Sequence, residues 1–423
     1  MLLYNLFPLL AGSFSCWGVH LKRAADMGFN WVYINPVQKT GASRSLYSIA
    51  DYFSLNPVLI DASSPISAEA QCRQMVQQGH AAGLKLMIDL VINHAAYDSP
   101  LTGQQPAWFV REPGGRIANA SCQHGHERVV WSDLAQFDHE HTCDREGLYR
   151  YCLRVVEHLI AMGFDGFRCD AAYQVPRWFW HRLIREVKAR HPNVCFAAET
   201  LGCSVDQTRN TAQAGFDYVF NSSKWWDLHG WWLIEQYNLI RETTRSISFP
   251  ESHDTPRLLE ELNGNLEGVK QRYLLSALFS SGVMMPMGFE YGLRKQLHVV
   301  ETTPKDWQVN GVDLQPFITK VNRIKCNHPV FREESLLNIL PCDNPNVLFM
   351  WKASAKHKEE ALLILNKDMQ HHQDFYTPHF RDYVQAGAPL KDVSPEYPME
   401  SLHEPFHYSL RPGQGIVLVT RRD

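Results

Sequence analysis

Several features that would place a protein in a special class are missing from this sequence of 423 residues. It has no stretch of about 20 apolar residues, so we expect no transmembrane helix and no membrane partner. Positive charge is not in excess, because 41 Lys and Arg face 45 Asp and Glu, a net charge of −4. A nucleic-acid partner is therefore not expected, since binding to a phosphate backbone depends on a basic surface. Long runs of like charge, internal repeats and low-complexity segments are also missing, which leaves an ordinary globular composition.

Cysteine motifs for metal binding are missing as well. The ten cysteines are scattered, and no two of them have the C-x-x-C spacing of a metal site. In a chain of this length they are typical of free thiols in a reducing compartment, so we predict a cytoplasmic protein. The apolar residues 1–12 lack the basic segment of a secretory signal, and we interpret them as part of a first buried strand.

The sequence does contain a repeated alternation of short apolar runs with longer amphipathic segments, which is the pattern of β-α units on a parallel sheet. The runs that predict strands are residues 2–10, 31–35, 85–92, 166–169, 194–198, 218–220, 246–249 and 283–287. The segments that predict helices are residues 16–27, 68–82, 145–162, 176–191, 205–214, 230–244, 266–280 and 314–325. Eight such units are the number that closes a (β/α)8 barrel, or TIM barrel, so the predicted fold class is α/β.

Two regions depart from this alternation. Residues 94–144 follow the third predicted strand and are polar and irregular, with Gly and Pro among them. A connection of this length indicates a short insertion with its own structure. Residues 336–423 show alternating apolar and polar stretches separated by turn residues, which predicts an antiparallel, sandwich-like β domain. We therefore predict a catalytic barrel over residues 1–335, including the insertion, and a β domain over residues 336–423.

Polar side chains gather at the carboxyl ends of the predicted strands, where barrel enzymes carry their active sites. In chain order they are Asp89, Asn93, His94, Arg168, Asp170, Glu199, His253 and Asp254. Retaining cleavage of a glycoside needs a carboxylate nucleophile and a carboxylic acid about 5–5.5 Å apart, and side chains on neighbouring strands can reach that separation. A single Asp at a strand end is more often a helix cap. Carboxylates from three strands at one rim, however, indicate chemistry.

These residues occur in four short motifs. Asp89-Leu-Val-Ile-Asn-His94, Gly166-Phe-Arg-Cys-Asp170, Ala198-Glu-Thr200 and Ser252-His-Asp254 stand in this order along the chain. Together they resemble the four motifs of the α-amylase family, glycoside hydrolase family 13. The separations also suit that family, since 199 − 170 = 29 and 254 − 199 = 55. The resemblance covers residues 1–335, and the tail looks like the C-terminal β domain of the family.

The resemblance implies a role for each matching residue. Asp170 would be the nucleophile, and Glu199 would act first as the acid and then as the base. Asp254 would bind hydroxyls of the reacting sugar and distort its ring. Arg168 would position Asp170 and keep it ionised, while Asp89 looks structural.

The resemblance also implies a set of residues that bind the sugar. His94 and His253 would donate or accept hydrogen bonds with the reacting sugar, and Tyr47 matches a family aromatic that stacks under it. The pairs Trp225-Trp226 and Trp231-Trp232 follow the sixth predicted strand. They fit either helix packing or an aromatic platform for further sugar rings.

Two stretches depart from the common family pattern. Starch-degrading members commonly have Lys-His where this chain has Tyr173-Gln174, which argues against ordinary endo-amylase behaviour. The stretch from Asp170 to Pro176 resembles a branch related to the bacterial maltosyltransferases that use maltose 1-phosphate. Those enzymes usually lack the Asn93-His94 pair that is present here.

The resemblance implies no organic cofactor, and it leaves a structural calcium ion as an alternative. In calcium-dependent members, residues that match Asn93 and Asp133 bind the ion together with a carbonyl near position 174. Calcium takes about 6–8 oxygen ligands. Two side chains and one carbonyl are only part of such a set.

The sequence thus predicts a retaining α-glycosidase or transglycosylase that acts on malto-oligosaccharides or related α-glucosides by double displacement. One alternative is a glucan maltosyltransferase that uses a phosphorylated donor or a phosphate acceptor. The other is a non-catalytic family member that binds carbohydrate or a partner protein. Retention of Asp170, Glu199 and Asp254 together argues against that last alternative, because a binding module needs neither a nucleophile nor an acid. The linkage and the oligomeric state stay open at this point.

Overall fold

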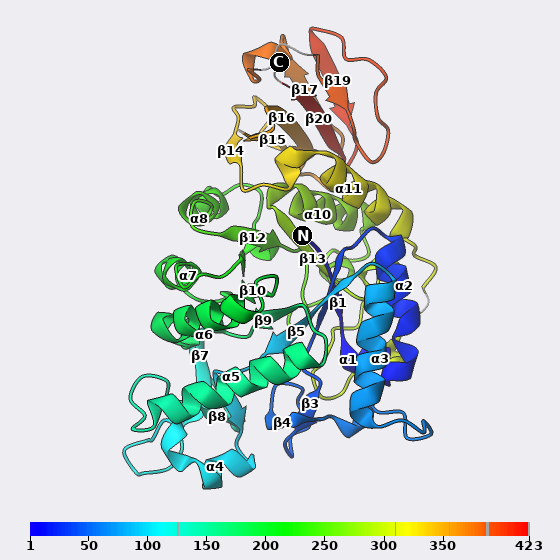
Figure 1. The fold of residues 1–423 in the computed structure, drawn as a ribbon. Coiled ribbons are helices and arrows are strands. Elements are labelled where there is room, and N and C mark those ends of the chain that lie inside the picture. Colours follow the sequence, from blue (N-terminus) through cyan, green and yellow to red (C-terminus); the bar gives the residue numbers. More distant parts are fainter. Residues whose placement is uncertain (125–126, 309, 355, 386–388, 422–423) are drawn as a thin grey trace. The chain divides into compact units, whose positions relative to one another are not determined.

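The computed structural model describes residues 1–423 except 125–126, 309, 355, 386–388 and 422–423. Eight parallel strands form a closed barrel in the order β1-β13-β12-β11-β10-β9-β5-β2 (Figure 1). The strands are β1 (Leu2–Leu6), β2 (Trp31–Ile34), β5 (Lys85–Leu90), β9 (Gly166–Cys169), β10 (Cys195–Ala198), β11 (Tyr218–Phe220), β12 (Arg245–Ser248) and β13 (Gly282–Pro286). The predicted barrel is confirmed.

Helices follow the strands as the amphipathic segments predict. The larger ones are α2 (Gly18–Asp26), α3 (Ala68–Ala81), α5 (Arg145–Ala161), α6 (Arg177–Arg190), α7 (Val205–Ala212), α8 (Trp232–Ile240), α10 (Leu266–Phe279) and α11 (Gln315–Asn327). Polar caps set several of their starts. Ser67 accepts from Ala70 N, and Ser204 forms a capping box with Gln207. Such caps satisfy main-chain N–H groups that have no partner inside the helix.

The first predicted strand is too long. The strand β1 ends at Leu6, and Pro8 begins a short helix, α1 (Pro8–Ala11). Proline suits the first turn of a helix because its fixed φ is helical and no N–H is needed there. The apolar residues on both sides of Pro8 hide this change in direction from a reading of hydrophobicity alone.

The predicted insertion after β5 has its own small sheet. The strands β6 (His94–Ala96), β8 (Glu127–Gln136) and β7 (Asn119–His124) pair antiparallel. The insertion also contains α4 (Pro100–Gln104) and ends before α5. A further hairpin, β3 (Gln38–Thr40) with β4 (Ile49–Leu55), follows β2 and carries Tyr47 in its connection.

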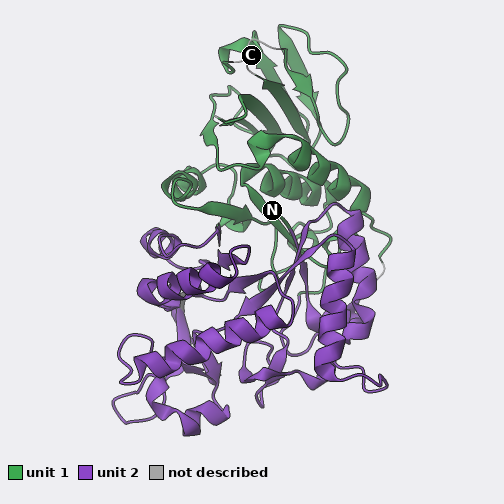
Figure 2. Cartoon of the chain, viewed as in Figure 1, with its two compact units in different colours: residues 1–2, 221–296, 309–423 green, residues 3–220, 297–308 purple. Residues whose placement is uncertain are grey.

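The chain divides into two compact units (Figure 2). Unit 1 consists of residues 1–2, 221–296 and 309–423, and unit 2 of residues 3–220 and 297–308. The barrel strands fall in both units, so this division leaves the predicted boundary at residue 335 a prediction.

The last part of unit 1 consists of antiparallel sheets. A five-stranded sheet has the order β14 (Leu336–Ile339), β15 (Val347–Ser354), β16 (Glu359–Asn366), β20 (Gly415–Arg421) and β18 (Lys391–Asp392). The strands β17 (Gln373–Thr377) and β19 (Phe406–Leu410) form a second sheet. A buried apolar cluster that includes Phe349, Leu362, Phe375 and Phe406 lies between strands of both sheets.

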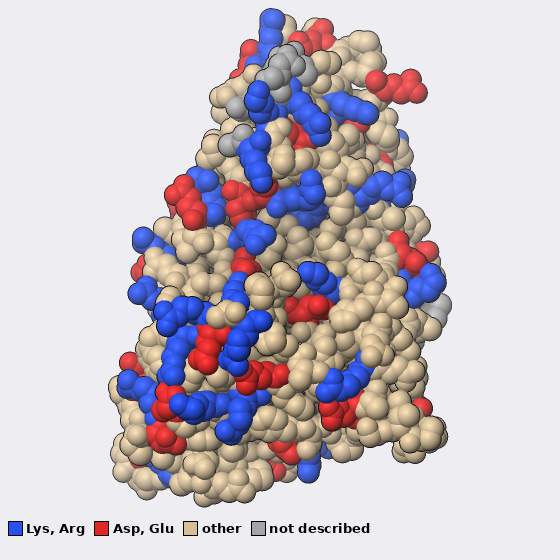
Figure 3. Space-filling view, in the orientation of Figure 1, with Lys and Arg blue, Asp and Glu red and all other residues tan. Residues whose placement is uncertain are grey.

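Charge is mixed over the visible surface. On the face drawn in Figure 3, Lys and Arg side chains alternate with Asp and Glu side chains. This agrees with the small net charge of −4. Among the described residues, no helix combines the length and apolarity needed to cross a membrane.

Candidate active site

Arg168 and Asp89 form the centre of a charged cluster in unit 2. They lie on adjacent strands in register, Asp89 on β5 and Arg168 on β9. Arg168 Nη1 donates to Asp89 Oδ1 at 2.9 Å and to Oδ2 at 3.1 Å, and both residues are buried. A side chain at Gly166 would bring its Cβ within 2.7 Å of the Cys195 carbonyl oxygen. The glycine of this motif therefore allows β9 to lie close to β10.

The same guanidinium also reaches the two predicted catalytic carboxylates. Arg168 Nη1 donates to Asp170 Oδ1 at 2.7 Å, and Nη2 lies 3.8 Å from Glu199 Oε2. The side chains of Asp170 and Glu199 are each 13% exposed. One buried cation thus contacts three carboxylates, Asp89 included, which leaves the ionised cluster with a net charge of −2. The structure brings together the sequence-predicted residues Asp89, Arg168, Asp170 and Glu199.

The main chain after Asp170 holds Glu199 in place. Ala171 N donates to Glu199 Oε2 at 2.6 Å, and Leu201 N donates to Oε1 at 3.3 Å. Ala171 has a φ of 38°, in the left-handed region that residues with a Cβ rarely adopt. Such strain persists only where the surroundings determine the conformation, and it is concentrated at functional sites.

A chain of buried polar side chains supports Asp89 from behind, and the sequence analysis missed most of it. Tyr33 and Tyr47 donate through their hydroxyls to Asp89 Oδ2 at 2.6 and 2.7 Å. Asn35 Nδ2 donates to the Tyr47 hydroxyl at 2.9 Å, and Asn5 Nδ2 donates to Asn35 Oδ1 at 2.8 Å. Polar residues in otherwise apolar strands were the only sign of this network in the sequence. The sequence does not show which of them form hydrogen bonds with each other.

Burial and charge act in opposite directions on this network. Burial raises the pKa of Asp89 to about 6, although Arg168 beside it lowers the pKa. Burial also raises the pKa of Tyr33 well above its usual value. Tyr33 is therefore a neutral hydroxyl that can donate to Asp89.

Tyr47 and His94, two predicted sugar-binding residues, contact each other. His94 Nε2 lies 3.1 Å from the Tyr47 carbonyl oxygen, and burial lowers the pKa of His94. Tyr52 OH donates to the carbonyl of His94 at 2.6 Å. The hairpin connection and β6 are thus joined next to the carboxylate cluster.

His253 and Asp254 follow β12 in unit 1. His253 Nε2 lies 3.1 Å from Asp254 Oδ2. The histidine side chain is buried, whereas that of Asp254 is 59% exposed. An exposed carboxylate beside a fixed imidazole can meet the hydroxyls of a ligand.

Known proteins are similar to this chain in sequence. A family model described as the glucanotransferase domain of glycogen debranching enzyme matches residues 3–109. Relatives named α-1,4-glucan:maltose-1-phosphate maltosyltransferase are 25% identical over 385 residues in Burkholderia pseudomallei and 27% identical over 368 residues in Mycobacterium tuberculosis. These alignments cover 87% and 80% of this chain, but 33% and 51% of the relatives. The chain thus spans between a third and about half the length of these curated relatives.

Solved structures with the same fold include an α-amylase from Lactobacillus plantarum, with a TM-score of 0.77 and 20% identity. The match covers 99% of this chain and 98% of that one. An α-amylase from H. orenii has a TM-score of 0.78 at 15% identity and covers 99% of both chains. The chain therefore has the fold of these α-amylases.

The structure has an uncharged pocket next to the predicted acid, Glu199. The pocket has a volume of about 250 Å³. Its described lining residues are Ser121, Cys122, Gln136, Tyr173, Gln174, Gly202, Cys203 and Gln207. Glu199 is close enough to raise the pKa of Tyr173, Cys122 and Cys203, in addition to the larger effect of burial. Tyr173 and Gln174 are the two positions where the chain departs from starch-degrading members.

Hydrogen bonds join the residues near the calcium position of the α-amylase family. Gln174 Oε1 accepts from Asn93 Nδ2 at 3.4 Å, and Gln174 Nε2 donates to the Ser121 carbonyl at 3.1 Å. The Gln174 amide thus joins Asn93 to Ser121 of β7. The Asp133 carbonyl accepts from Tyr97 N at 2.8 Å. Among the described residues, no group of three or more His, Cys, Asp or Glu is arranged to hold a metal ion.

The tryptophans after β11 divide between the two predicted roles. Trp226 is buried and donates through Nε1 to the Gly230 carbonyl at 2.6 Å, so it packs. Trp225, Trp231 and Trp232 are between 39% and 56% exposed. A sugar platform made by these three stays a prediction.

Proposed function

We propose that the chain is a retaining enzyme that breaks an α-glucosidic bond and passes the glucan unit to a sugar hydroxyl or to water. The observation that carries this proposal is the single guanidinium of Arg168, which contacts both Asp170 and Glu199. A nucleophile and an acid beside one bond are the requirement of double displacement.

In the first step, an oxygen of Asp170 bonds to the anomeric carbon while the bond to the leaving oxygen breaks. Glu199 gives its proton to that oxygen. In the second step, Glu199 takes the proton from the acceptor hydroxyl, whose oxygen bonds to the anomeric carbon as the bond to Asp170 breaks. The net negative charge around Arg168 favours the positive charge that develops on the sugar.

The remaining predicted residues would bind the reacting sugar. Asp254 would hold two of its hydroxyls, and His94 and His253 would hydrogen-bond it, with Tyr47 against the ring. His94 and Tyr47 are fixed by their mutual contact, and His253 is fixed by burial. Residues held in one conformation lose little entropy on binding, which favours precise placement of a substrate.

The uncharged pocket beside Glu199 supports transfer to a sugar. Its amide and hydroxyl side chains, with the Tyr173 ring, suit a neutral acceptor or leaving group better than an anion. A bound acceptor sugar would also displace water from the intermediate. We therefore propose neutral malto-oligosaccharides as both donors and acceptors.

Product analysis tests this proposal. Purified protein incubated with maltotetraose should produce both shorter and longer oligosaccharides, because the same intermediate can be intercepted by sugar or by water. The variant Asp170→Asn should lose this activity by about 10⁴-fold or more, since the nucleophile is removed. Equal inactivity of both proteins on a broad panel of α-glucosides would favour the non-catalytic alternative instead.

A phosphorylated donor is the second candidate, because the named relatives are maltose-1-phosphate maltosyltransferases. Release of inorganic phosphate from maltose 1-phosphate in the presence of maltotetraose measures it directly. We expect this donor to be used at least about 10-fold less efficiently than maltotetraose. A preference for maltose 1-phosphate would replace the neutral donor by the phosphorylated one and leave the double displacement intact.

We propose further that the fold needs no calcium ion at Asn93, because the Gln174 amide joins Asn93 and β7 there by hydrogen bonds. The melting temperature of the wild type should be the same in EDTA and in millimolar calcium. The variant Gln174→Glu replaces the N–H that donates to the Ser121 carbonyl by a carboxylate oxygen. Asn93 Oδ1 nearby is buried without a partner among the described residues, so the variant should gain affinity for calcium. Stabilisation of the wild type by calcium as large as that of the variant would contradict the proposal.

A cytoplasmic location is also proposed. The ten cysteines are free thiols in the structure, and burial raises the pKa of Cys72 to about 12, which makes it unreactive. Labelling of unfolded protein taken from cells under acid quench should find all ten as thiols. Disulfides in that sample would point to an oxidising compartment.

A further inference from the structure

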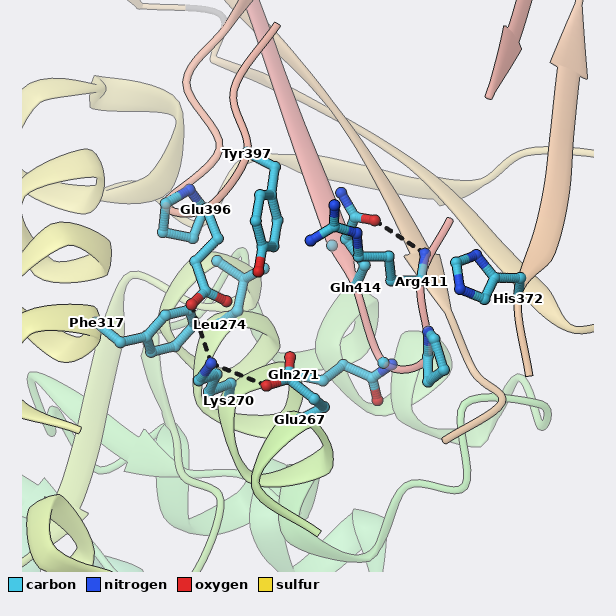
Figure 4. Close-up of a pocket in the computed structure, with 14 residues that line it drawn as sticks. Glu267, Lys270, Gln271, Leu274, Phe317, His372, Glu396, Tyr397, Arg411 and Gln414 are labelled. Atoms are coloured by element: carbon cyan, nitrogen blue, oxygen red, sulfur yellow. Dashed lines mark hydrogen bonds and ion pairs between the residues drawn. The ribbon is translucent and has the colours of Figure 1, made fainter. Parts of the chain in front are cut away.

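A cavity in unit 1 carries a second group of polar and aromatic side chains, separate in sequence from the carboxylate cluster. Its volume is about 230 Å³. The helix α10 lines it with Glu267, Lys270, Gln271 and Leu274, and turns of the C-terminal sheets line the opposite side (Figure 4). Residues at spacings of three and four lie on one face of a helix, so this wall of the cavity is a continuous helix face.

The charges in this cavity are balanced. Lys270 Nζ lies 2.9 Å from Glu267 Oε1 and 3.0 Å from Glu396 Oε1. Arg411 is the second permanent cation of the lining. Two cations and two carboxylates sum to zero, so an ion of either sign gains no net attraction. The lining nevertheless offers many hydrogen-bond donors and acceptors.

Tyr397 is held over the cavity in a strained conformation. Its φ is 53°, and the residue is 54% exposed. Asp392 closes the loop at both ends, because its oxygens accept from Ser394 N at 2.8 Å and from Met399 N at 2.9 Å. In Figure 4 the ring of Tyr397 points from this loop toward α10, between Glu396 and Gln414. An exposed tyrosine held at a backbone φ that residues with a Cβ rarely adopt indicates a function.

Arg411 completes the aromatic side of the cavity. Its Cζ lies 3.8 Å from the centre of the Tyr397 ring. Its main-chain N donates to Gln414 Oε1 at 2.9 Å, and no hydrogen bond from its guanidinium is found among the described residues, so the guanidinium can donate to a ligand. The turn that carries Arg411 lies close to α10, because a Cβ at Gly413 would be 3.1 Å from the Glu267 carbonyl oxygen. The site is therefore built from backbone that has little freedom.

We propose that this cavity is an accessory binding site for a short segment of a neutral α-glucan chain. Tyr397, which has Arg411 over one face of its ring, supplies an apolar surface for the sugar, as Tyr does in many interfaces. Arg411, the Gln side chains and the two carboxylates hydrogen-bond its hydroxyls. The volume is below the range of about 300–1,000 Å³ typical of sites that enclose a ligand of drug size, so it admits one or two sugar units of a longer chain. This choice of ligand rests on the proposed function.

Binding by the full-length Asp170→Asn protein tests the cavity without turnover. Calorimetric titration with maltoheptaose should show, besides binding at the carboxylate cluster, a second binding event that disappears in Tyr397→Gly and Arg411→Ala on this background. Glycine is chosen because it adopts a φ of 53° without strain. The control is Tyr376→Ala, which removes a tyrosine that is 58% exposed on β17, outside the cavity lining. Inorganic phosphate, as a competing probe, should leave the binding unchanged.

Unchanged maltoheptaose binding in both cavity variants would overturn the inference, and so would competition by phosphate or the absence of any Tyr397-dependent binding.

Kinetics then separate the two proposals. The Tyr397→Gly protein with Asp170 intact should show a KM for glycogen raised about fivefold or more, with kcat and the KM for maltotriose unchanged. If the wild type processes no α-glucan, the proposed function fails on its own. The titration still decides whether the cavity binds sugar.

Discussion

Two arginines mark the two regions where we place sugar, and their surroundings differ. Arg168 is buried among three carboxylates, while Arg411 lies on an exposed tyrosine with its guanidinium open. The first cluster has an excess of negative charge, which suits a transition state that becomes positive. The second cavity is neutral, which suits a ligand that never becomes charged. The balance of charge in each region therefore distinguishes a site for reaction from a site for attachment.

The largest expected effect belongs to the acid of the reactive region. Glu199→Gln keeps the shape and the contact with Ala171 N but cannot give a proton. We expect kcat on maltotetraose to fall about 10²–10⁴-fold. The kcat on an aryl α-maltoside, whose leaving group needs no proton, should fall much less. Equal losses of kcat on both substrates would show that Glu199 is not the acid.

The two arginines should also differ in what they contribute to stability. Arg168→Met leaves buried carboxylates without their cation, which we expect to lower the free energy of unfolding by about 3–5 kcal/mol. Arg411→Met removes an arginine with no buried partner, and we expect the free energy of unfolding to fall by about 0.5 kcal/mol or less. Denaturant unfolding at pH 7 measures both. Similar losses of stability in the two variants would show that burial of the arginine does not decide how much it contributes to stability.

The pH dependence of stability provides a test of Asp89. Burial raises its pKa from the ordinary 3.8 to about 6, so the folded chain holds a proton that the unfolded chain releases between these values. The contribution of this group to stability is therefore largest below about pH 4 and is lost as the pH rises through 6. Relative to Asp89→Asn, the free energy of unfolding of the wild type should fall by up to about 3 kcal/mol across that pH range. Parallel stability curves for the two proteins would contradict the raised pKa.

The smallest effect concerns backbone strain, which occurs in both regions at Ala171 and Tyr397. Ala171→Gly should raise the free energy of unfolding by at most about 1 kcal/mol, because relief of strain exceeds the added freedom of the unfolded chain. Activity should change little, since the N–H that contacts Glu199 remains. Ala172→Gly is the matched control, because Ala172 is outside the set with positive φ, and it should lower stability. A large loss of activity in Ala171→Gly would mean that rigidity at this residue matters for the reaction.

Much of the barrel could be predicted because its signals are local. The strands at residues 166–169 and 218–220 have the predicted ends, and most other elements differ by one or two residues. The error at Pro8 arose because apolar runs look alike whether they form a strand or a short helix. The antiparallel tail could likewise be predicted from its alternation of apolar and polar residues.

The candidate site was predictable only in part. Asp170, Glu199 and Arg168 belong to motifs at strand ends, so their meeting followed from the barrel itself. The support behind Asp89 did not, because Tyr33 and Asp89 are 56 positions apart and Asn5 and Asn35 are 30 apart. Single polar residues in apolar strands carry no information about their partners.

The sequence by itself determined the order of the strands and the four motifs, and thus the resemblance to the α-amylase family. Only the tertiary structure decided that one guanidinium contacts both predicted catalytic carboxylates and that the Gln174 amide joins Asn93 to β7 of the insertion. It also decided that a neutral cavity lies against α10. The physical reason is that hydrophobic periodicity is repeated along the chain and can be read locally. Hydrogen bonds and charge balance depend on groups that only folding brings within about 3 Å of one another.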